Sequence, residues 1–134
     1  MPYQSRRVLC AEPHADTCRL LTEMLERQGH EVVTAVSVRE CLDLAGDSRF
    51  DLYMLDDDYI DGTALELCRR LRAMTPHTPV LFFSAQALQR DRQRAFEAGA
   101  DSYFIKPGDI FEIVQAVNSI LGSPSPRAHE VERP

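Results

Sequence analysis

Four polar residues stand at the ends of short apolar runs, and their types suit chemistry on a phosphoryl group. Glu12 and Asp56 supply carboxylates, Ser84 a hydroxyl and Lys106 an ammonium. A carboxylate can act as a nucleophile, a hydroxyl can donate a hydrogen bond, and a lysine can neutralise charge on transferred oxygens. In open α/β sheets, ligands bind outside the carboxyl ends of the strands. If the runs are parallel strands, these side chains form a phosphoryl site at one edge of a sheet.

Lys106 is distinctive because it is the only lysine in the chain, whereas the other fourteen cations are arginine. A lysine presents a compact, mobile point charge that suits a phosphate. Its position at a strand end could equally be chance. Pro107 follows, and because X-Pro bonds adopt the cis form far more readily than other peptide bonds, this bond is a candidate for it.

The elements that position these residues are five apolar, β-prone runs separated by segments of helical length. The runs are Arg7–Ala11, Glu31–Ala35, Asp51–Leu55, Val80–Ser84 and Ser102–Ile105. Such alternation predicts βαβ units and a parallel sheet. The central runs are almost continuously hydrophobic, which is typical of strands covered by helices on both faces.

Helix ends are marked by capping residues and glycines. Asp16 can cap a first helix that Gly29 ends. Three pairs have the spacing of a capping box: Ser37 with Glu40, Thr63 with Glu66, and Asp109 with Glu112. We expect a fourth helix over Gln86–Ala98, ended by Gly99, and a last helix over Ile110–Leu121, ended by Gly122.

Length and composition describe an ordinary globular domain. The 134 residues fit one domain, and a net charge of -6 with a pI near 5.1 argues against general binding of nucleic acid or a membrane surface. No apolar run approaches the roughly 20 residues of a membrane helix. Four cysteines without a CxxC pair predict buried free thiols in a reducing cytosol, and hence a cytoplasmic protein.

Residues 1–121 are expected to form the folded domain. After Gly122 the chain reads Ser-Pro-Ser-Pro and continues with a polar stretch to Pro134. Such a stretch has little to bury, so we expect residues 122–134 to be a disordered tail. It could instead begin a linker to a further domain.

The chain resembles the receiver domains of two-component response regulators. Three stretches carry the resemblance: Asp51-Leu-Tyr-Met-Leu-Asp56 with Asp61-Gly-Thr-Ala-Leu-Glu-Leu67, Thr78-Pro-Val-Leu-Phe-Phe-Ser-Ala85, and Ala98-Gly-Ala-Asp-Ser-Tyr-Phe-Ile-Lys-Pro107. The resemblance runs from about Arg7 to Leu121. It implies a doubly wound, flavodoxin-like α/β fold with a five-stranded parallel sheet in the order 2-1-3-4-5, flanked by five helices.

The resemblance also implies roles for individual residues. Asp56 would accept a phosphoryl group from the phosphohistidine of a sensor histidine kinase or a phosphotransfer protein, and Ser84 and Lys106 would contact it. Tyr103 matches the aromatic switch residue that swings inward when the hydroxyl at Ser84 moves towards the phosphate; it could also be an ordinary half-buried strand tyrosine. The signal would reach the face formed by the fourth helix, fifth strand and fifth helix, through which receivers often form homodimers.

The acidic pocket departs from the family pattern. The family has two adjacent acids after the first strand to hold Mg²⁺, but here Pro13 follows Glu12 and replaces the second acid. The remaining metal ligands implied by the family are Glu12, Asp56 and the backbone carbonyl of Asp58. Losing a carboxylate should weaken Mg²⁺ binding or abolish it, because Mg²⁺ demands near-ideal octahedral oxygen coordination. His14 is a poor substitute because imidazole suits softer metals.

The loop after Asp56 is unusually acidic, since Asp57 and Asp58 extend it to a triplet. Crowded carboxylates repel one another, so either a cation or a raised pKa should relieve them. Ile60 and Ala64 also replace a proline and a glycine that are common in the family.

Three functions compete. The leading hypothesis is a phosphoryl-accepting receiver, a signalling switch and not an enzyme. The second is a pseudo-receiver, which keeps the fold as a protein-binding module and acts without phosphate; Pro13 motivates it. The third is a phosphatase similar to haloacid dehalogenases, because Asp56 and Asp58 have the DxD spacing, but there the DxD strand usually comes first in the chain, whereas here two strands precede it.

Overall fold

The computed structural model describes residues 6–122, and the expected disordered tail lies outside the described residues except for Gly122. Five parallel strands form one sheet in the order β2-β1-β3-β6-β7. They are β1 (Arg7–Ala11), β2 (Glu31–Ala35), β3 (Leu52–Leu55), β6 (Val80–Ser84) and β7 (Ser102–Ile105). This order confirms the predicted doubly wound fold, and the five predicted strands match to within one residue, the difference being Asp51.

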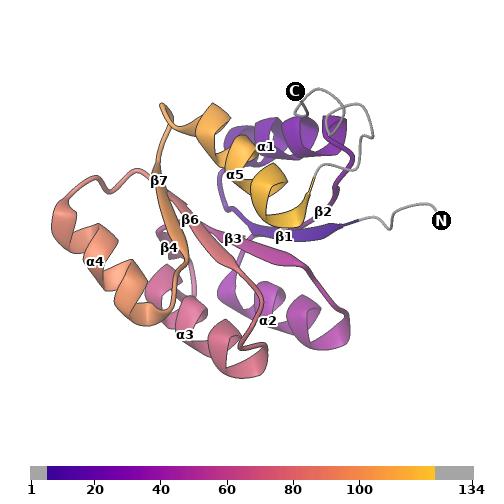
Figure 1. Ribbon diagram of the computed structural model, residues 1–134. Coiled ribbons are helices and arrows are strands. Elements are labelled where there is room, and N and C mark those ends of the chain that lie inside the picture. Colours follow the sequence, from indigo (N-terminus) through magenta and orange to yellow (C-terminus); the bar gives the residue numbers. More distant parts are fainter. Residues whose placement is uncertain (1–5, 123–134) are drawn as a thin grey trace.

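Five helices flank the sheet in two layers (Figure 1). They are α1 (Ala15–Arg27), α2 (Val38–Asp47), α3 (Ala64–Met74), α4 (Gln89–Ala98) and α5 (Ile110–Leu121). Helices α1 and α5 lie on one face, and α2, α3 and α4 lie on the other. A short antiparallel hairpin, β4 (Asp58–Tyr59) and β5 (Gly62–Thr63), stands between β3 and α3, and it was not predicted. No helix among residues 6–122 is both long and apolar enough to cross a lipid bilayer.

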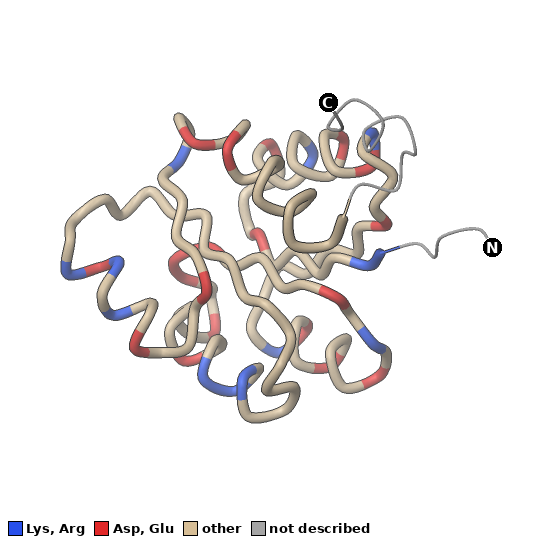
Figure 2. The backbone as a smooth tube through the Cα atoms, in the orientation of Figure 1, with Lys and Arg blue, Asp and Glu red and all other residues tan. Residues whose placement is uncertain are grey.

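Alternation along the strands divides the core into two layers. In β1, Val8 and Cys10 pack with residues of α1 and α5, whereas Leu9 and Ala11 pack with residues of α2, α3 and α4. All four are at most 1% exposed. Because successive side chains of a strand point to opposite faces, helices must cover both sides of the central strands. Charged residues accordingly lie mainly on the helices and loops around the sheet (Figure 2).

The predicted N-caps Ser37 and Thr63 are confirmed, whereas the Glu40 carboxylate accepts from the Val36 amide and so does not complete the predicted capping box with Ser37. The hydroxyls of Ser37 and Thr63 accept hydrogen bonds from Glu40 and Glu66. Asp16 does not cap α1: the N-cap is His14, without a side-chain bond, and Asp16 lies in the first turn. Asp109 is the N-cap of α5, but its carboxylate accepts from the Ile105 amide instead of capping that helix.

Helix α4 begins three residues later than predicted, and two large hydrophobic residues at this helix are exposed. Leu88 is its N-cap and is 56% exposed, and Phe96 is 42% exposed. Only the small residues Ala95 and Ala98 of this helix are buried. The helix is therefore held to the domain by a narrow apolar contact.

The register of the parallel strands places the predicted site residues at the same height along the sheet. Ala11 of β1 pairs with Leu55 of β3, and Ser84 of β6 pairs with Ile105 of β7. Glu12, Asp56 and Lys106 each follow one of these paired residues directly. Three chain segments separated by more than forty residues thus present their polar side chains at the same edge of the sheet.

Candidate functional site

A buried ion-pair cluster occupies the carboxyl edge of the sheet. The ammonium of Lys106 lies 2.7 Å from Asp56 Oδ1 and 2.9 Å from Glu12 Oε1. The side chains of Asp56 and Glu12 are 2% and 3% exposed, and that of Lys106 is 12% exposed. Buried charges of this kind require a partner, since an isolated carboxylate in the interior is strongly disfavoured. The only lysine of the chain therefore bridges both predicted carboxylates.

Burial and charge act on these groups in opposite directions. Burial raises the pKa of Glu12, although the hydrogen bond from Lys106 acts to lower it. Burial alone would lower the pKa of Lys106, but hydrogen bonds to Asp56 and Glu12 outweigh it and raise that pKa. Lys106 therefore stays cationic at neutral pH. The Lys106–Pro107 peptide bond is cis, as the sequence suggested.

Tyr59 ties the ends of β1 and β3 together, a role that sequence reasoning missed. Its hydroxyl accepts a 2.8 Å hydrogen bond from the Asp56 amide and donates a 2.7 Å bond to the Ala11 carbonyl. The residue is 7% exposed, and burial raises the pKa of its hydroxyl. The available signal was an aromatic residue inside an otherwise acidic loop. Tyr59 positions the backbone on which the Asp56 carboxylate stands.

Asp57 turns towards β6. Its carboxylate accepts a hydrogen bond from the Ser84 hydroxyl and one of 3.3 Å from the Ala85 amide. Burial raises the pKa of Asp57 to about 6, and the charge of Asp56 adds to the effect. The acidic triplet led us to expect a raised pKa from repulsion, but burial is its main cause and the charge of Asp56 only the second. The contact to Ser84 could not be read from the sequence.

Tyr103, the predicted switch residue, is 6% exposed and lies beside Ser84. The Tyr103 hydroxyl donates a hydrogen bond that is shared by two acceptors, Ser84 Oγ at 3.0 Å and the Gln86 carbonyl oxygen at 2.7 Å. Its ring stacks on Phe82 with the centroids 5.8 Å apart. Tyr103 is thus a buried residue in contact with Ser84 rather than a half-buried strand tyrosine.

A second side of the acidic cluster could hold a divalent cation. Ligand atoms of Glu12, His14 and Asp56 all lie within 4.8 Å of one another. His14 Nε2 lies 3.4 Å from Asp56 Oδ2, and Glu12 Oε2 accepts a hydrogen bond from the His14 amide. Lys106 contacts the other oxygen of each carboxylate, so one oxygen of each faces His14.

The donor set fits a divalent metal ion, because carboxylates bind hard cations and imidazole adds an affinity for transition metals. Pro13 contributes no side-chain ligand, and His14, expected to be a poor ligand, is the residue that joins the two carboxylates in this cluster. The backbone carbonyl of Asp58 stays a prediction.

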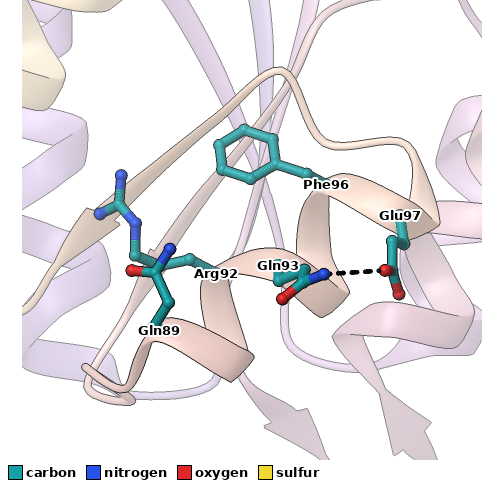
Figure 3. A pocket seen from close by; sticks show the side chains of 5 residues that line it. All are labelled: Gln89, Arg92, Gln93, Phe96 and Glu97. Atoms are coloured by element: carbon teal, nitrogen blue, oxygen red, sulfur yellow. Dashed lines mark hydrogen bonds between the residues drawn. The ribbon is translucent and has the colours of Figure 1, made fainter.

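Helix α4 carries a separate, open hollow of about 480 Å³ (Figure 3). It is lined by Gln89, Arg92, Gln93, Phe96 and Glu97. None of these residues belongs to the acidic cluster. The Arg92 guanidinium, however, also lies 5.7 Å from the centre of the Tyr103 ring, so this surface contacts the predicted switch residue.

Known proteins of similar sequence share one domain type. The family described as the response regulator receiver domain matches residues 8–118. The transcriptional regulatory protein PrrA of Mycobacterium tuberculosis is 36% identical over 117 residues, covering 87% of this chain and 50% of PrrA. The transcriptional regulatory protein CpxR of Escherichia coli is 33% identical over 115 residues, covering 86% and 49%. The chain thus spans about half the length of these curated relatives.

Solved structures agree over nearly all of the described chain. A two-component response regulator from Clostridium difficile has a TM-score of 0.83 at 25% identity, covering 87% of this chain and 96% of that one. The non-phosphorylated HemR receiver domain from Leptospira biflexa has a TM-score of 0.80 at 29% identity, covering 88% and 95%.

Proposed function

Because the chain belongs to the response regulator receiver domain family, we propose that it accepts a phosphoryl group on Asp56 and so switches a protein-interaction face. The donor is the phosphohistidine of a sensor histidine kinase or a phosphotransfer protein. The observation that carries this proposal is the contact of 2.7 Å between the only lysine, Lys106, and the buried Asp56 carboxylate. A carboxylate held beside a cation at the carboxyl edge of a parallel sheet suits phosphoryl transfer.

In the transfer, an oxygen of Asp56 attacks phosphorus, the bond from phosphorus to the donor imidazole nitrogen breaks, and an acyl phosphate forms. Lys106 neutralises the phosphoryl oxygens, and Ser84 donates a hydrogen bond to one of them. A divalent cation, held by Glu12 and Asp56 with the Asp58 carbonyl, would supply further charge neutralisation. We expect weak Mg²⁺ affinity, because Pro13 removes one carboxylate from this set.

The readout is proposed to be the face formed by α4, β7 and α5. Tyr103 lies in β7 beside Ser84, and Arg92 connects its ring to the surface of α4. A change at Ser84 therefore has a route of direct contacts to this face, through which we propose a homodimer or a partner protein binds. We propose no nucleic-acid contact by this domain, whose net charge is -6.

A phosphorylation-independent pseudo-receiver is the second candidate. Two observations favour it: proline stands at residue 13, where the family pattern implies a second acid, and the Ser84 hydroxyl already donates its hydrogen bond to the Asp57 carboxylate. In that case the face of α4, β7 and α5 binds its partner regardless of phosphoryl donor and metal.

Intact mass after incubation with a small-molecule phosphodonor separates the two candidates. The native protein and Asp56→Asn are treated with Mg²⁺, with Mn²⁺ and with a chelator. We expect the mass to rise by one phosphoryl group in the native protein only, and only with a metal ion. A native protein that is folded by circular dichroism yet gains no mass supports the pseudo-receiver. Continuous hydrolysis of a generic phosphomonoester would instead indicate an enzyme.

A further inference from the structure

Asp57 holds the groups that a phosphoryl group on its neighbour Asp56 would need. Its carboxylate accepts from the Ser84 hydroxyl and from the Ala85 amide, both at the carboxyl end of β6. A serine hydroxyl has one proton, so Ser84 can donate to one anion at a time. The Asp57 carboxylate and a phosphoryl group on Asp56 therefore compete for the same donor.

A chain of hydrogen bonds runs from Asp57 to the predicted switch residue. With its proton given to Asp57, Ser84 Oγ accepts from the Gln86 amide at 2.9 Å and from the Tyr103 hydroxyl at 3.0 Å. The same Tyr103 proton is shared with the Gln86 carbonyl oxygen, which lies 2.7 Å from the hydroxyl. Asp57 thus orients the hydroxyl that holds Tyr103 in its buried position.

The chain ends at a surface. The Tyr103 ring lies against the Arg92 guanidinium, and Arg92 lines the hollow on α4 (Figure 3). A movement of Tyr103 would therefore remove a contact of Arg92, one of the side chains that line this hollow.

We propose that Asp57 is an internal substitute for the phosphoryl group: it holds Ser84 and Tyr103 inward before modification, and phosphorylation of Asp56 takes over Ser84 and displaces the Asp57 carboxylate. Tyr103 is then inward in both states, and the change that reaches the face of α4, β7 and α5 is the movement of Asp57. This inference rests on the proposed phosphoryl site and adds to it a residue that regulates it. Electrostatic repulsion would displace the Asp57 side chain, because a phosphoryl group on Asp56 adds negative charge directly beside the Asp57 carboxylate. A cavity of about 50 Å³, bordered by Asp57 and Tyr103 among others, gives the displaced side chain room to move.

Two expected results distinguish this regulatory role of Asp57 from a purely structural one. Removal of the Asp57 carboxylate should release Tyr103 from its inward position in the unmodified protein. It should also speed phosphorylation of Asp56, since the incoming group no longer competes for Ser84. A purely structural role predicts neither a change confined to Tyr103 nor a faster reaction.

The position of Tyr103 can be followed by ¹⁹F NMR of protein labelled with fluorotyrosine, with Tyr103→Phe assigning its resonance among the four tyrosines. We expect the Tyr103 resonance to move towards the solvent-exposed position in Asp57→Ala, and beryllofluoride with Mg²⁺ to bring it back. Asp16→Asn is the matched control, because it removes an exposed acid of α1 with no contact to Ser84. A Tyr103 resonance that is the same in Asp57→Ala and the native protein overturns the proposal.

The rate of phosphorylation is measured on the same proteins by intact mass, at one pH and a saturating metal concentration. We expect Asp57→Ala and Asp57→Asn to react faster, by about tenfold for Ala, the gain expected when one hydrogen bond to a charged group no longer has to be broken. An Asp57→Ala rate at or below the native rate contradicts the competition. If no protein gains a phosphoryl group, the proposed function fails, whereas the NMR result still decides whether Asp57 holds Tyr103.

Discussion

Replacing Lys106 with methionine tests the central cluster, because methionine keeps an apolar side chain of similar length but removes the charge. Glu12 and Asp56 would then face each other with no cation between them. Removing one partner of a buried ion pair costs about 3–5 kcal/mol. The Lys106 side chain is 12% exposed, so we expect the lower end, about 3 kcal/mol of unfolding free energy at pH 7. That is a large fraction of the stability of an ordinary domain.

The loss should depend on pH in a defined direction. Burial already raises the pKa of Glu12 in the native protein, and without Lys106 it should rise further. A carboxyl group whose pKa is higher in the folded than in the unfolded state binds more protons when folded, so its contribution to stability falls as pH rises. The deficit of Lys106→Met should therefore shrink between pH 7 and pH 5.

Urea unfolding followed by circular dichroism measures this effect, with a chelator present so that no divalent cation replaces the lysine. Arg39→Met is the control, because the Arg39 side chain makes an exposed ion pair with Asp43 at 3.8 Å, and its loss should change stability by less than about 0.5 kcal/mol. A Lys106→Met loss no greater than that of Arg39→Met would refute the view that Lys106 neutralises two buried carboxylates.

Three further predictions concern other parts of the fold. Phe83→Ala should lower the unfolding free energy by about 3–5 kcal/mol in urea unfolding, because the ring is fully buried beneath α5. Thr63→Ala should cost about 1 kcal/mol and lower Tm by a few degrees in a thermal melt, because it removes the N-cap of α3, whereas Thr17→Ala, at a half-buried position inside α1 that is not its N-cap, should not. Cys18, whose pKa is lowered to about 6 chiefly by a hydrogen bond from Cys10, should react with iodoacetamide at a rate that rises through pH 6 and levels off by pH 8. Cys41, whose pKa burial raises to about 12, should stay unlabelled over that range, and equal rates at the two thiols by peptide mass analysis would contradict this.

Some local predictions failed because a side chain had a better partner elsewhere in the fold. Asp109 has the spacing of a capping box, yet its carboxylate accepts from the Ile105 amide across the turn. Asp61 binds the amides of Val38 and Arg39 and so caps α2 from a loop more than twenty residues away. A spacing rule considers only neighbours along the chain, and both partners here are set by the approach of separate segments.

Helix α4 shows the same limit for hydrophobic patterning. Leu88 and Phe96 fit an apolar pattern, but both are exposed, and the helix contacts the core mainly through Ala95 and Ala98. A hydrophobic residue can face solvent where its helix crosses the edge of a sheet and only one narrow stripe reaches the core. The pattern alone does not say where that crossing lies.

The sequence by itself determined the five strands and, through the family resemblance, the order of the sheet. It also determined that Glu12, Asp56 and Lys106 follow strand ends at the same edge of the sheet. Strand positions follow from local hydrophobicity, and parallel pairing then brings the strand ends to one edge. Only the tertiary structure decided which side chains meet there: that Lys106 bridges both carboxylates, that Tyr59 joins β1 to β3, and that Asp57 turns to Ser84. These contacts depend on side-chain directions and on distances of a few ångströms between segments far apart in the chain, which residue types and spacing do not specify.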